Sequence, residues 1–269
     1  MGISDPGMAD TMARQQAILR AMALFALENG TMCKHQTDFY SQEKVEETET
    51  KYQEIYCFTA EFSEELPTIT IIKDTLLPST ETVILAAIPK NQLQQTHKEN
   101  MWVEIFFYNN ESDISNGNNM SKTFDIRIRK KKSDDTLVLD ACSFYQLNGK
   151  ATGMRCLCAK SQFVYNHYEF FYSTGQSVPF GDSVDFHGTT CKQGLWIAYI
   201  SQIMERLSMQ TKLLVKESLN VSANSSLSSA ELVRERSQCR LSWRINDLSI
   251  RDDKMLVNLS VSTYQSVSK

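Results

Sequence analysis

Apolar and polar residues alternate strictly in several places along a strand-rich stretch of the chain, roughly residues 52–172. The clearest case is residues 124–129, which read Phe-Asp-Ile-Arg-Ile-Arg. A period of two is typical of a β-strand that buries one face, because successive side chains of a strand point to opposite sides of the sheet. On this basis we predict strands at residues 55–62, 68–72, 82–88, 102–108, 123–129, 137–145, 154–158 and 163–172.

The segments between these strands indicate how the strands pair. Residues 109–119 are rich in Asn, Ser, Asp and Gly, and shorter polar turns lie at residues 133–135 and 146–149. Such segments are typical of hairpin connections. Parallel strands need longer crossovers, usually helical, and the sequence predicts none between these strands. We therefore expect mostly antiparallel pairing.

A helical pattern replaces the strand pattern after residue 190. Residues 190–193, Thr-Cys-Lys-Gln, match a capping box, in which the Thr hydroxyl and the Gln side chain satisfy backbone amides of the first turn. We predict a helix that begins at Cys191 and runs to about residue 216. Its apolar stripe consists of Trp196, Ile200, Ile203, Leu207 and Leu214.

Further elements are predicted at both ends of the chain. Residues 9–28 read as a helix that ends at Asn29-Gly30, a C-terminal cap. Residues 219–229 read as a Ser- and Asn-rich linker, and Ser228-Ser-Ala-Glu231 matches a second capping box, which predicts a short helix. Alternation at residues 241–245 and 257–261 predicts a final β-hairpin.

These elements predict an α+β fold. The central part is a mostly antiparallel sheet, or a partly closed barrel, of about seven or eight strands, packed by the amphipathic helix of residues 191–216. We divide the chain into an N-terminal lead and helix (1–35), a β-rich core with its closing helix (36–217), and a linker, short helix and hairpin (218–269) that we expect to pack on the core.

Composition and charge exclude several classes of protein. With 42% hydrophobic and 22% charged residues, the chain is typical of a globular protein. A formal net charge of -4 gives no general attraction to nucleic acid or anionic lipid. No apolar run approaches the roughly 20 residues of a membrane-spanning helix. The apolar residues 21–27 are followed by no signal-peptide cleavage site, which argues against secretion.

The cysteine content also favours an intracellular protein, cytoplasmic or nuclear. The chain has 7 cysteines, an odd number spread widely, which is typical of reduced thiols. Asn-x-Ser/Thr sequons would indicate a secreted glycoprotein instead, but without a signal peptide they have no route to glycosylation. They lie at Asn29, Asn110, Asn119, Asn220, Asn224 and Asn258.

One region collects the residue types that bind zinc. A structural zinc site needs four converging thiolates or imidazoles. A Cys-x-Cys pair on a strand sends its thiols to opposite faces of the sheet, so we favour cysteines that pack as small apolar residues, and we expect no cofactor. A zinc-stabilised protein remains the alternative. The candidate ligands are Cys156, Cys158, His167, His187 and Cys191.

The same region offers a Cys–His nucleophile. At the start of the predicted helix, the thiolate of Cys191 would be stabilised by the helix dipole. His187 or His167 would act as the base, with Asp185 or Asp182 as the carboxylate that orients it. No signature of a Cys-dependent hydrolase surrounds these residues, so catalysis here is an alternative and not the main expectation.

A basic run at residues 127–132 is the one local positive patch. Arg127, Arg129 and Lys131 fall on one face of a strand, where they would contact phosphate groups of a nucleic acid. Asp134 and Asp135 follow directly, and no aromatic residues interleave the run. We therefore favour the alternative interpretation of an edge strand whose charges prevent pairing with another sheet.

No motif in the chain specifies a reaction. We therefore expect a non-catalytic, intracellular protein-interaction module or a subunit of a multiprotein complex, whose partner is another protein. The alternatives are a Cys-dependent hydrolase or zinc-stabilised protein centred on residues 156–191, and an accessory protein that binds nucleic acid through residues 127–132.

Overall fold

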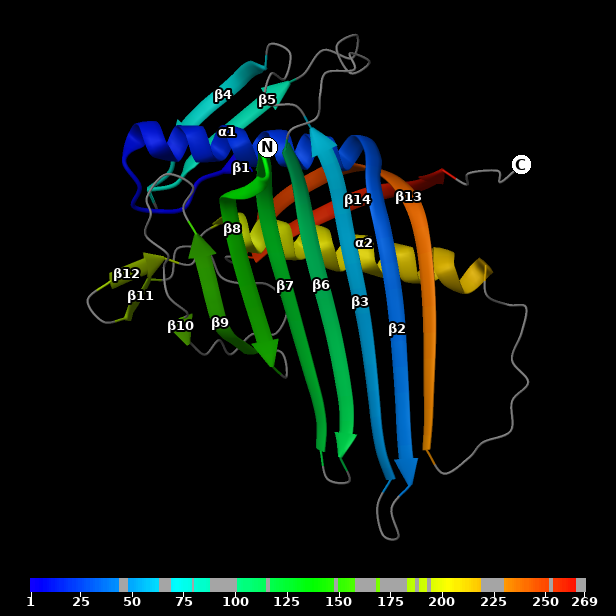
Figure 1. The fold of residues 1–269 in the computed structure, drawn as a ribbon. Helices are drawn as coiled ribbons and strands as arrows, with labels where there is room; N and C mark the ends of the chain where they lie inside the picture. Colours follow the sequence, from blue (N-terminus) through cyan, green and yellow to red (C-terminus); the bar gives the residue numbers. More distant parts are fainter. Residues whose placement is uncertain are drawn as a thin grey trace.

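The computed structural model of the protein describes residues 1–43, 48–62, 69–78, 80–87, 101–114, 117–147, 150–157, 168–169, 183–186, 189–192, 195–218, 230–251 and 254–264. Within these ranges the chain forms three β-sheets and two long helices (Figure 1).

The largest sheet has nine strands in the described ranges, and every neighbouring pair is antiparallel. The prediction of an α+β fold with a mostly antiparallel sheet is therefore confirmed. The strands, in spatial order, are β10 (Tyr168–Glu169), β9 (Lys150–Leu157), β8 (Asp135–Leu147), β7 (Gly117–Lys132), β6 (Met101–Ile114), β3 (Thr48–Phe62), β2 (Thr31–Glu43), β13 (Ala230–Arg251) and β14 (Lys254–Tyr264).

Two smaller sheets and two helices complete the described structure. Both helices cross the same face of the large sheet, behind the upper half of its strands in Figure 1. Neither helix has the length of apolar sequence that a membrane crossing requires. The helices are α1 (Asp10–Gly30) and α2 (Leu195–Ser218), and the small sheets consist of β1 (Gly2–Ile3), β5 (Thr82–Ala87) and β4 (Thr70–Leu76), and of β11 (Ser183–Phe186) and β12 (Thr189–Lys192).

The core lies between the large sheet and the two helices. Alternate residues of the central strands are buried on this inner face, among them Phe58 of β3, Ile105 of β6 and Ile126 of β7. They belong to one buried cluster with Leu24 of α1 and Ile203 of α2. Burial of such apolar side chains is the main favourable contribution to folding. The alternation in the sequence therefore corresponds to the two faces of the sheet.

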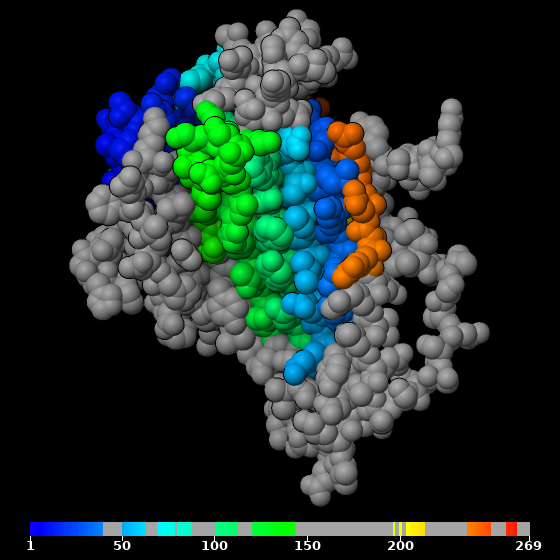
Figure 2. Space-filling view, viewed as in Figure 1, coloured from blue at the N-terminus to red at the C-terminus, as the bar shows by residue number. Residues whose placement is uncertain are grey.

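The opposite, outer face of the large sheet is a broad surface of mixed polarity. Figure 2 shows strands β8, β7, β6, β3, β2 and β13 side by side on this face. Half-exposed apolar residues such as Ile55 and Phe106 lie there beside ion pairs between neighbouring charged side chains. Interspersed charges of this kind limit the size of any contiguous apolar patch.

A fully buried arginine connects α1 to the sheet. Arg20 is 0% exposed, and its guanidinium donates to both carboxylate oxygens of Asp140 on β8, with an Nε–Oδ2 distance of 2.7 Å. The same group pairs with Asp5 at 2.9 Å and donates to the carbonyl of Ile3. Its central carbon lies 4.8 Å from the centre of the Trp196 ring of α2. Arg20 thus joins the N-terminal segment, both helices and β8.

Two predicted helix starts are wrong. Residues 189–192 form β12, so α2 begins at Leu195 and the sequence Thr190–Gln193 does not cap it. In place of a short helix opened by Ser228, β13 begins at Ala230. In both places the backbone bonds to a neighbouring strand. A helix cap contributes only about 1 kcal/mol, so strand pairing can override it.

The C-terminal hairpin is confirmed, but its first strand is much longer than predicted. Residues 241–245 and 257–261 lie on β13 and β14, with Ile245 opposite Leu259. The earlier part of β13 pairs with β2, from Ala230 opposite Gln42 to Leu241 opposite Thr31. Strand β2 has no counterpart among the predicted strands. The hairpin is therefore hydrogen-bonded into the large sheet.

Candidate functional site

The structure places only some of the predicted cysteine and histidine candidates. Cys156 lies on β9 opposite Cys142 of β8, while Cys158, His167, His187 and Asp182 lie outside the described residues. Among the residues whose side chains are described, no three of His, Cys, Asp or Glu converge as a metal site. A zinc site formed by residues 156–191 therefore stays a prediction.

The structure removes one of the reasons for expecting a Cys–His nucleophile at Cys191. Cys191 lies on β12 opposite Val184, and Asp185 lies on β11 opposite Thr190. Because α2 begins only at Leu195, Cys191 does not lie at the N-terminus of that helix, which was the ground for expecting a stabilised thiolate. A hydrolase built on Cys191, His187 and Asp185 stays a prediction.

The basic run lies on a central strand. β7 is hydrogen-bonded to β6 on one side and β8 on the other, so the interpretation of residues 127–132 as an edge strand is wrong. Arg127 forms an ion pair with Asp125, and Arg129 Nε lies 3.2 Å from Glu104 Oε2. Lys131 is exposed. Both arginine charges are thus balanced on the outer face, and contact of this run with nucleic acid stays a prediction.

A pocket of about 160 Å³ lies between α2 and the inner face of β3, β6 and β7. We call it the α2 pocket. Tyr56 and Phe107 form its buried aromatic floor. The other lining residues are Glu54, Asn109, Lys122, Glu205, Ser208, Met209 and Lys212.

The register of the sheet explains how these residues meet. Directly opposed residues of neighbouring antiparallel strands lie on the same face, so they form rows across β2, β3, β6 and β7. The row that contains the two floor residues is His35, Tyr56, Phe107 and Phe124. The next row, at pocket level, is Thr37, Glu54, Asn109 and Lys122. A third row, which we call the exposed row, is Phe39, Tyr52, Glu111 and Met120.

Glu54 is the central polar group of the α2 pocket. Its side chain is 4% exposed, and its Oε1 lies 2.6 Å from Lys212 Nζ of α2. The Tyr52 hydroxyl donates to the same oxygen at 2.5 Å, and Asn109 Nδ2 donates to Oε2 at 3.4 Å. Lys212 also lies over the ring of Tyr52, 5.3 Å from its centre.

These partners decide the ionisation of the pocket. Burial by itself raises the pKa of Glu54, but the hydrogen bonds from Lys212 and Tyr52 outweigh it, and the pKa lies below its ordinary value of 4.5. Burial and the neighbouring carboxylate of Glu54 raise the pKa of Tyr52 above its ordinary range. Glu54 is therefore held as a carboxylate and Tyr52 as a neutral phenol.

A second ion pair and one unpaired acceptor complete the pocket. Lys122 Nζ of β7 lies 3.2 Å from Glu205 Oε1 of α2. The side-chain oxygen of Asn109 is buried and has no hydrogen-bond partner among the described residues. A buried acceptor without a partner costs about 1–3 kcal/mol. The pocket thus has balanced charges and one acceptor that a bound donor would satisfy.

Exposed apolar side chains lie at the pocket and in the adjacent exposed row. Met209 of α2, which lines it, is 57% exposed, and in the exposed row Met120 is 43% and Phe39 39% exposed. Met and aromatic side chains are enriched at protein interfaces relative to other surfaces. The α2 pocket and the exposed row together form a polar centre with apolar surroundings.

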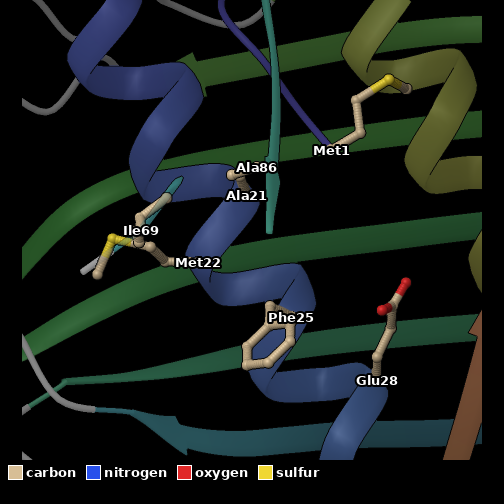
Figure 3. A pocket seen from close by; sticks show the side chains of 7 residues that line it. All are labelled: Met1, Ala21, Met22, Phe25, Glu28, Ile69 and Ala86. Carbon is tan, nitrogen blue, oxygen red and sulfur yellow. The ribbon is translucent and has the colours of Figure 1, made fainter. Parts of the chain in front are cut away.

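A second cavity, of about 60 Å³, lies between α1 and the three-stranded sheet (Figure 3). Phe25 and Met22 of α1 line it together with Ile69 and Ala86. Glu28 also lines it, and burial raises the pKa of that carboxyl. A water occupies about 30 Å³ in the liquid, so this cavity has room for a water or two and not for an organic ligand.

Sequence reasoning missed every residue of the α2 pocket. Glu54, Asn109, Lys122, Glu205 and Lys212 come from four separate elements and match no motif. The alternation that places Glu54 and Lys122 on the inner face was the only signal available.

Comparisons of the chain with family models, with curated proteins and with solved structures gave no match.

Proposed function

We propose that the protein is a non-catalytic protein-interaction module or a subunit of a multiprotein complex, and that a partner protein docks on the α2 pocket and the exposed row. The partner inserts one tyrosine-like side chain, with a ring and a hydrogen-bond donor, into the pocket. The observation that carries this proposal is the unpaired buried oxygen of Asn109 in a small pocket with an aromatic floor.

The size of the pocket supports a single inserted side chain. Sites for drug-sized molecules and cofactors enclose about 300–1,000 Å³. The α2 pocket has about 160 Å³. An engineered protein cavity of about 150 Å³ is filled by benzene, so a volume of this order accommodates one aromatic ring. Aromatic anchors that fill such pockets are frequent hot spots of protein interfaces.

The chemistry of the pocket supports a neutral ring with a donor. Glu54 and Glu205 are each paired with a lysine, so the pocket has no net charge to attract an ion. Tyr56 and Phe107 provide an apolar floor for a ring. The oxygen of Asn109 accepts a hydrogen bond and cannot donate one. A phenol satisfies all three conditions.

The ionisation of the pocket argues against acid–base catalysis there. A general acid or base works best when its pKa lies near the operating pH. The pKa of Glu54 is shifted downward and that of Tyr52 upward, away from neutrality in both cases. These groups are suited to hold a fixed structure.

Paired substitutions on α2 test the proposal. Met209 lines the pocket, whereas the neighbouring Gln210 is also exposed but does not. We expect Met209→Arg to weaken binding of the native partner roughly tenfold or more, because it places a charge in the apolar surroundings of the pocket. Gln210→Arg adds the same charge and should leave binding unchanged. Quantitative affinity purification, with a photocrosslinking residue at position 209, measures both effects.

A small probe tests the pocket without knowledge of the partner. We expect p-cresol, the analogue of a tyrosine side chain, to shift the methyl NMR signals of Met209 and Met120. Toluene, which lacks the hydroxyl, should bind more weakly. Equal loss of partner binding in both arginine variants, or a turnover activity abolished by Cys191→Ala, would overturn the proposal.

A further inference from the structure

Two cysteines face each other where the C-terminal hairpin joins the large sheet. Cys33 of β2 and Cys239 of β13 are directly opposite in the register of the two strands. Both are free thiols. Cys33 is 0% exposed, whereas Cys239 is partly exposed. Opposed residues of an antiparallel pair lie on the same face, so both side chains lie on the inner face.

The strand geometry fits a disulfide without movement of the backbone. Directly opposed residues of antiparallel strands have Cα atoms about 4.5 or 5.5 Å apart, depending on the type of pair. Disulfides join Cα atoms about 4.4–6.8 Å apart. Both kinds of pair fall within this range. Each of the two thiols shifts the pKa of the other, as expected for close neighbours.

The environments of the two thiols assign different roles to them. The hydrogen bond from Cys33 lowers the pKa of the Cys239 thiol. The same hydrogen bond and burial raise the pKa of Cys33. The thiolate is the nucleophilic form of cysteine, and a partly exposed thiolate reacts first with an oxidant. Because Cys239 is also the more exposed of the two, it is suited to be the attacking thiol and Cys33 the resolving thiol.

Cys57 and Cys142 are the other free cysteines whose burial the structure describes. Cys57 lies on β3 opposite Lys34, and since the adjacent residue Phe58 faces inward, Cys57 faces the outer side of the sheet. Burial raises the pKa of Cys57. Cys142 is buried, and its opposite residue is Cys156. Cys57 therefore serves as a matched control for Cys239, because it is a half-buried thiol of the same sheet, on β3 next to β2.

We propose that Cys33 and Cys239 form a reversible intramolecular disulfide when the protein is exposed to a peroxide. The Cys239 thiolate attacks one oxygen of hydrogen peroxide, the O–O bond breaks, and the leaving hydroxide takes a proton to become water. The sulfur of Cys33 then attacks the sulfenic acid on Cys239. The S–S bond forms, the S–O bond breaks, and the hydroxide leaves with the Cys33 proton as a second water. Two thiols lose two electrons, and the peroxide gains them.

The crosslink would hold together strands that are far apart in the sequence. The side chains of Gln238 and Met32, next to the two cysteines, belong to residues 206 positions apart. Closing so long a loop restricts the unfolded chain strongly. The disulfide should therefore raise the melting temperature and fix β13 against β2. This inference does not depend on the proposed function.

Peptide mapping under non-reducing conditions tests the inference on the full-length protein. After reduction and then treatment with hydrogen peroxide, we expect a linked peptide pair that contains Cys33 and Cys239. The melting temperature should rise on the order of 10 °C and return to its starting value after reduction. Cys239→Ala should abolish both the linked pair and the rise, whereas Cys57→Ala should retain both.

Other outcomes would overturn the inference. One is a linked pair that joins Cys33 or Cys239 to a different cysteine. Another is oxidation of Cys239 to the sulfinic acid with Cys33 still a free thiol. The mapping uses the unsubstituted protein, so it decides the question even where a cysteine variant does not fold.

Discussion

Arg20 shows what a single buried charge requires from its surroundings. Burial by itself lowers the pKa of Arg20, but the carboxylates of Asp140 and Asp5 outweigh it and raise the pKa above its ordinary value, so the side chain stays charged. Moving a charge into a protein interior costs several kcal/mol, which well-placed partners offset. Loss of Arg20 would leave the buried carboxylate of Asp140 without a compensating charge.

We therefore expect Arg20→Ala to lower the free energy of unfolding by about 3–5 kcal/mol. Arg14 is the matched control, because it lies on the same helix but forms an exposed ion pair with Asp74 at 2.6 Å. Arg14→Ala should cost about 1 kcal/mol or less. Urea denaturation of both variants measures the difference. Losses of equal size would contradict the central role of the Arg20 network.

Glu54 predicts a dependence of stability on pH. Because the pKa of Glu54 is lower in the folded protein than its ordinary 4.5, the carboxylate stabilises the folded state above that pH. This contribution is lost as the pH falls through the lower, folded pKa. We expect Glu54→Gln to cost about 1–3 kcal/mol at pH 7, and the difference from the unsubstituted protein to shrink below pH 4.5.

The matched control for Glu54 is Glu61, an exposed carboxylate on the same strand. Glu61→Gln should change stability little at either pH, because its charge is solvated in both the folded and unfolded states. Thermal denaturation of the three proteins between acidic and neutral pH measures the effect. A Glu54→Gln variant with the same pH profile as the unsubstituted protein would refute the explanation.

At the scale of elements, β13 completes the core and is not an accessory to it. Leu241 and Trp243 of β13 are buried, and the Trp243 indole donates to Thr31 Oγ1 of β2 at 3.1 Å. Without β13, strand β2 would become an unpaired edge, and such an edge is prone to pair with other chains. The hairpin thus covers both a sheet edge and part of the core.

Truncation tests this role of the hairpin. We expect removal of residues 230–269 to abolish cooperative unfolding and to give an aggregating protein that binds hydrophobic dyes. Removal of only residues 265–269, which follow β14, is the control and should leave the melting temperature nearly unchanged. A stable, monomeric chain of residues 1–229 would contradict the role of β13 and would support a domain boundary near residue 217.

The alternation is clearest where the inner and outer faces of a strand differ in polarity. Residues 123–129 bury Phe124, Ile126 and Ile128 on one face and carry charged residues on the other, so their period of two is clear. In β2 the inner face carries Thr31, Cys33 and His35, which do not stand out from the polar outer face. β2 pairs with β13, which is distant in the sequence, and no local sequence pattern predicts that pairing.

The candidate site was beyond sequence reasoning for the same reason. Glu54 and Lys212 meet only because α2 crosses the sheet at one particular level of its register. The residue types of the pocket are ordinary surface types, which no motif distinguishes. The sequence suggested Cys156, Cys158 and Cys191 as functional cysteines. The opposed pair that the structure shows consists of two other cysteines, Cys33 and Cys239.

At the scale of the whole molecule, the large sheet is assembled from both ends of the chain. Strands β6, β7, β8 and β9 follow one another as hairpins, so each pairs with a strand close to it in the sequence. Strand β2 pairs on one side with β3, which follows it directly in the sequence. On the other side it pairs with β13, which is close to the C-terminus. Folds that depend on such distant pairs form more slowly than folds built from local pairs.

The pairing of β2 with β13 has a consequence for synthesis of the protein in the cell. Trp243 is translated 212 residues after Thr31, to which it donates its hydrogen bond. At about 5–20 residues per second, a ribosome needs roughly 10–40 s to cover that distance. During this interval the nascent chain has an open edge at β2, so its yield in the cell should depend on chaperones that bind the growing chain.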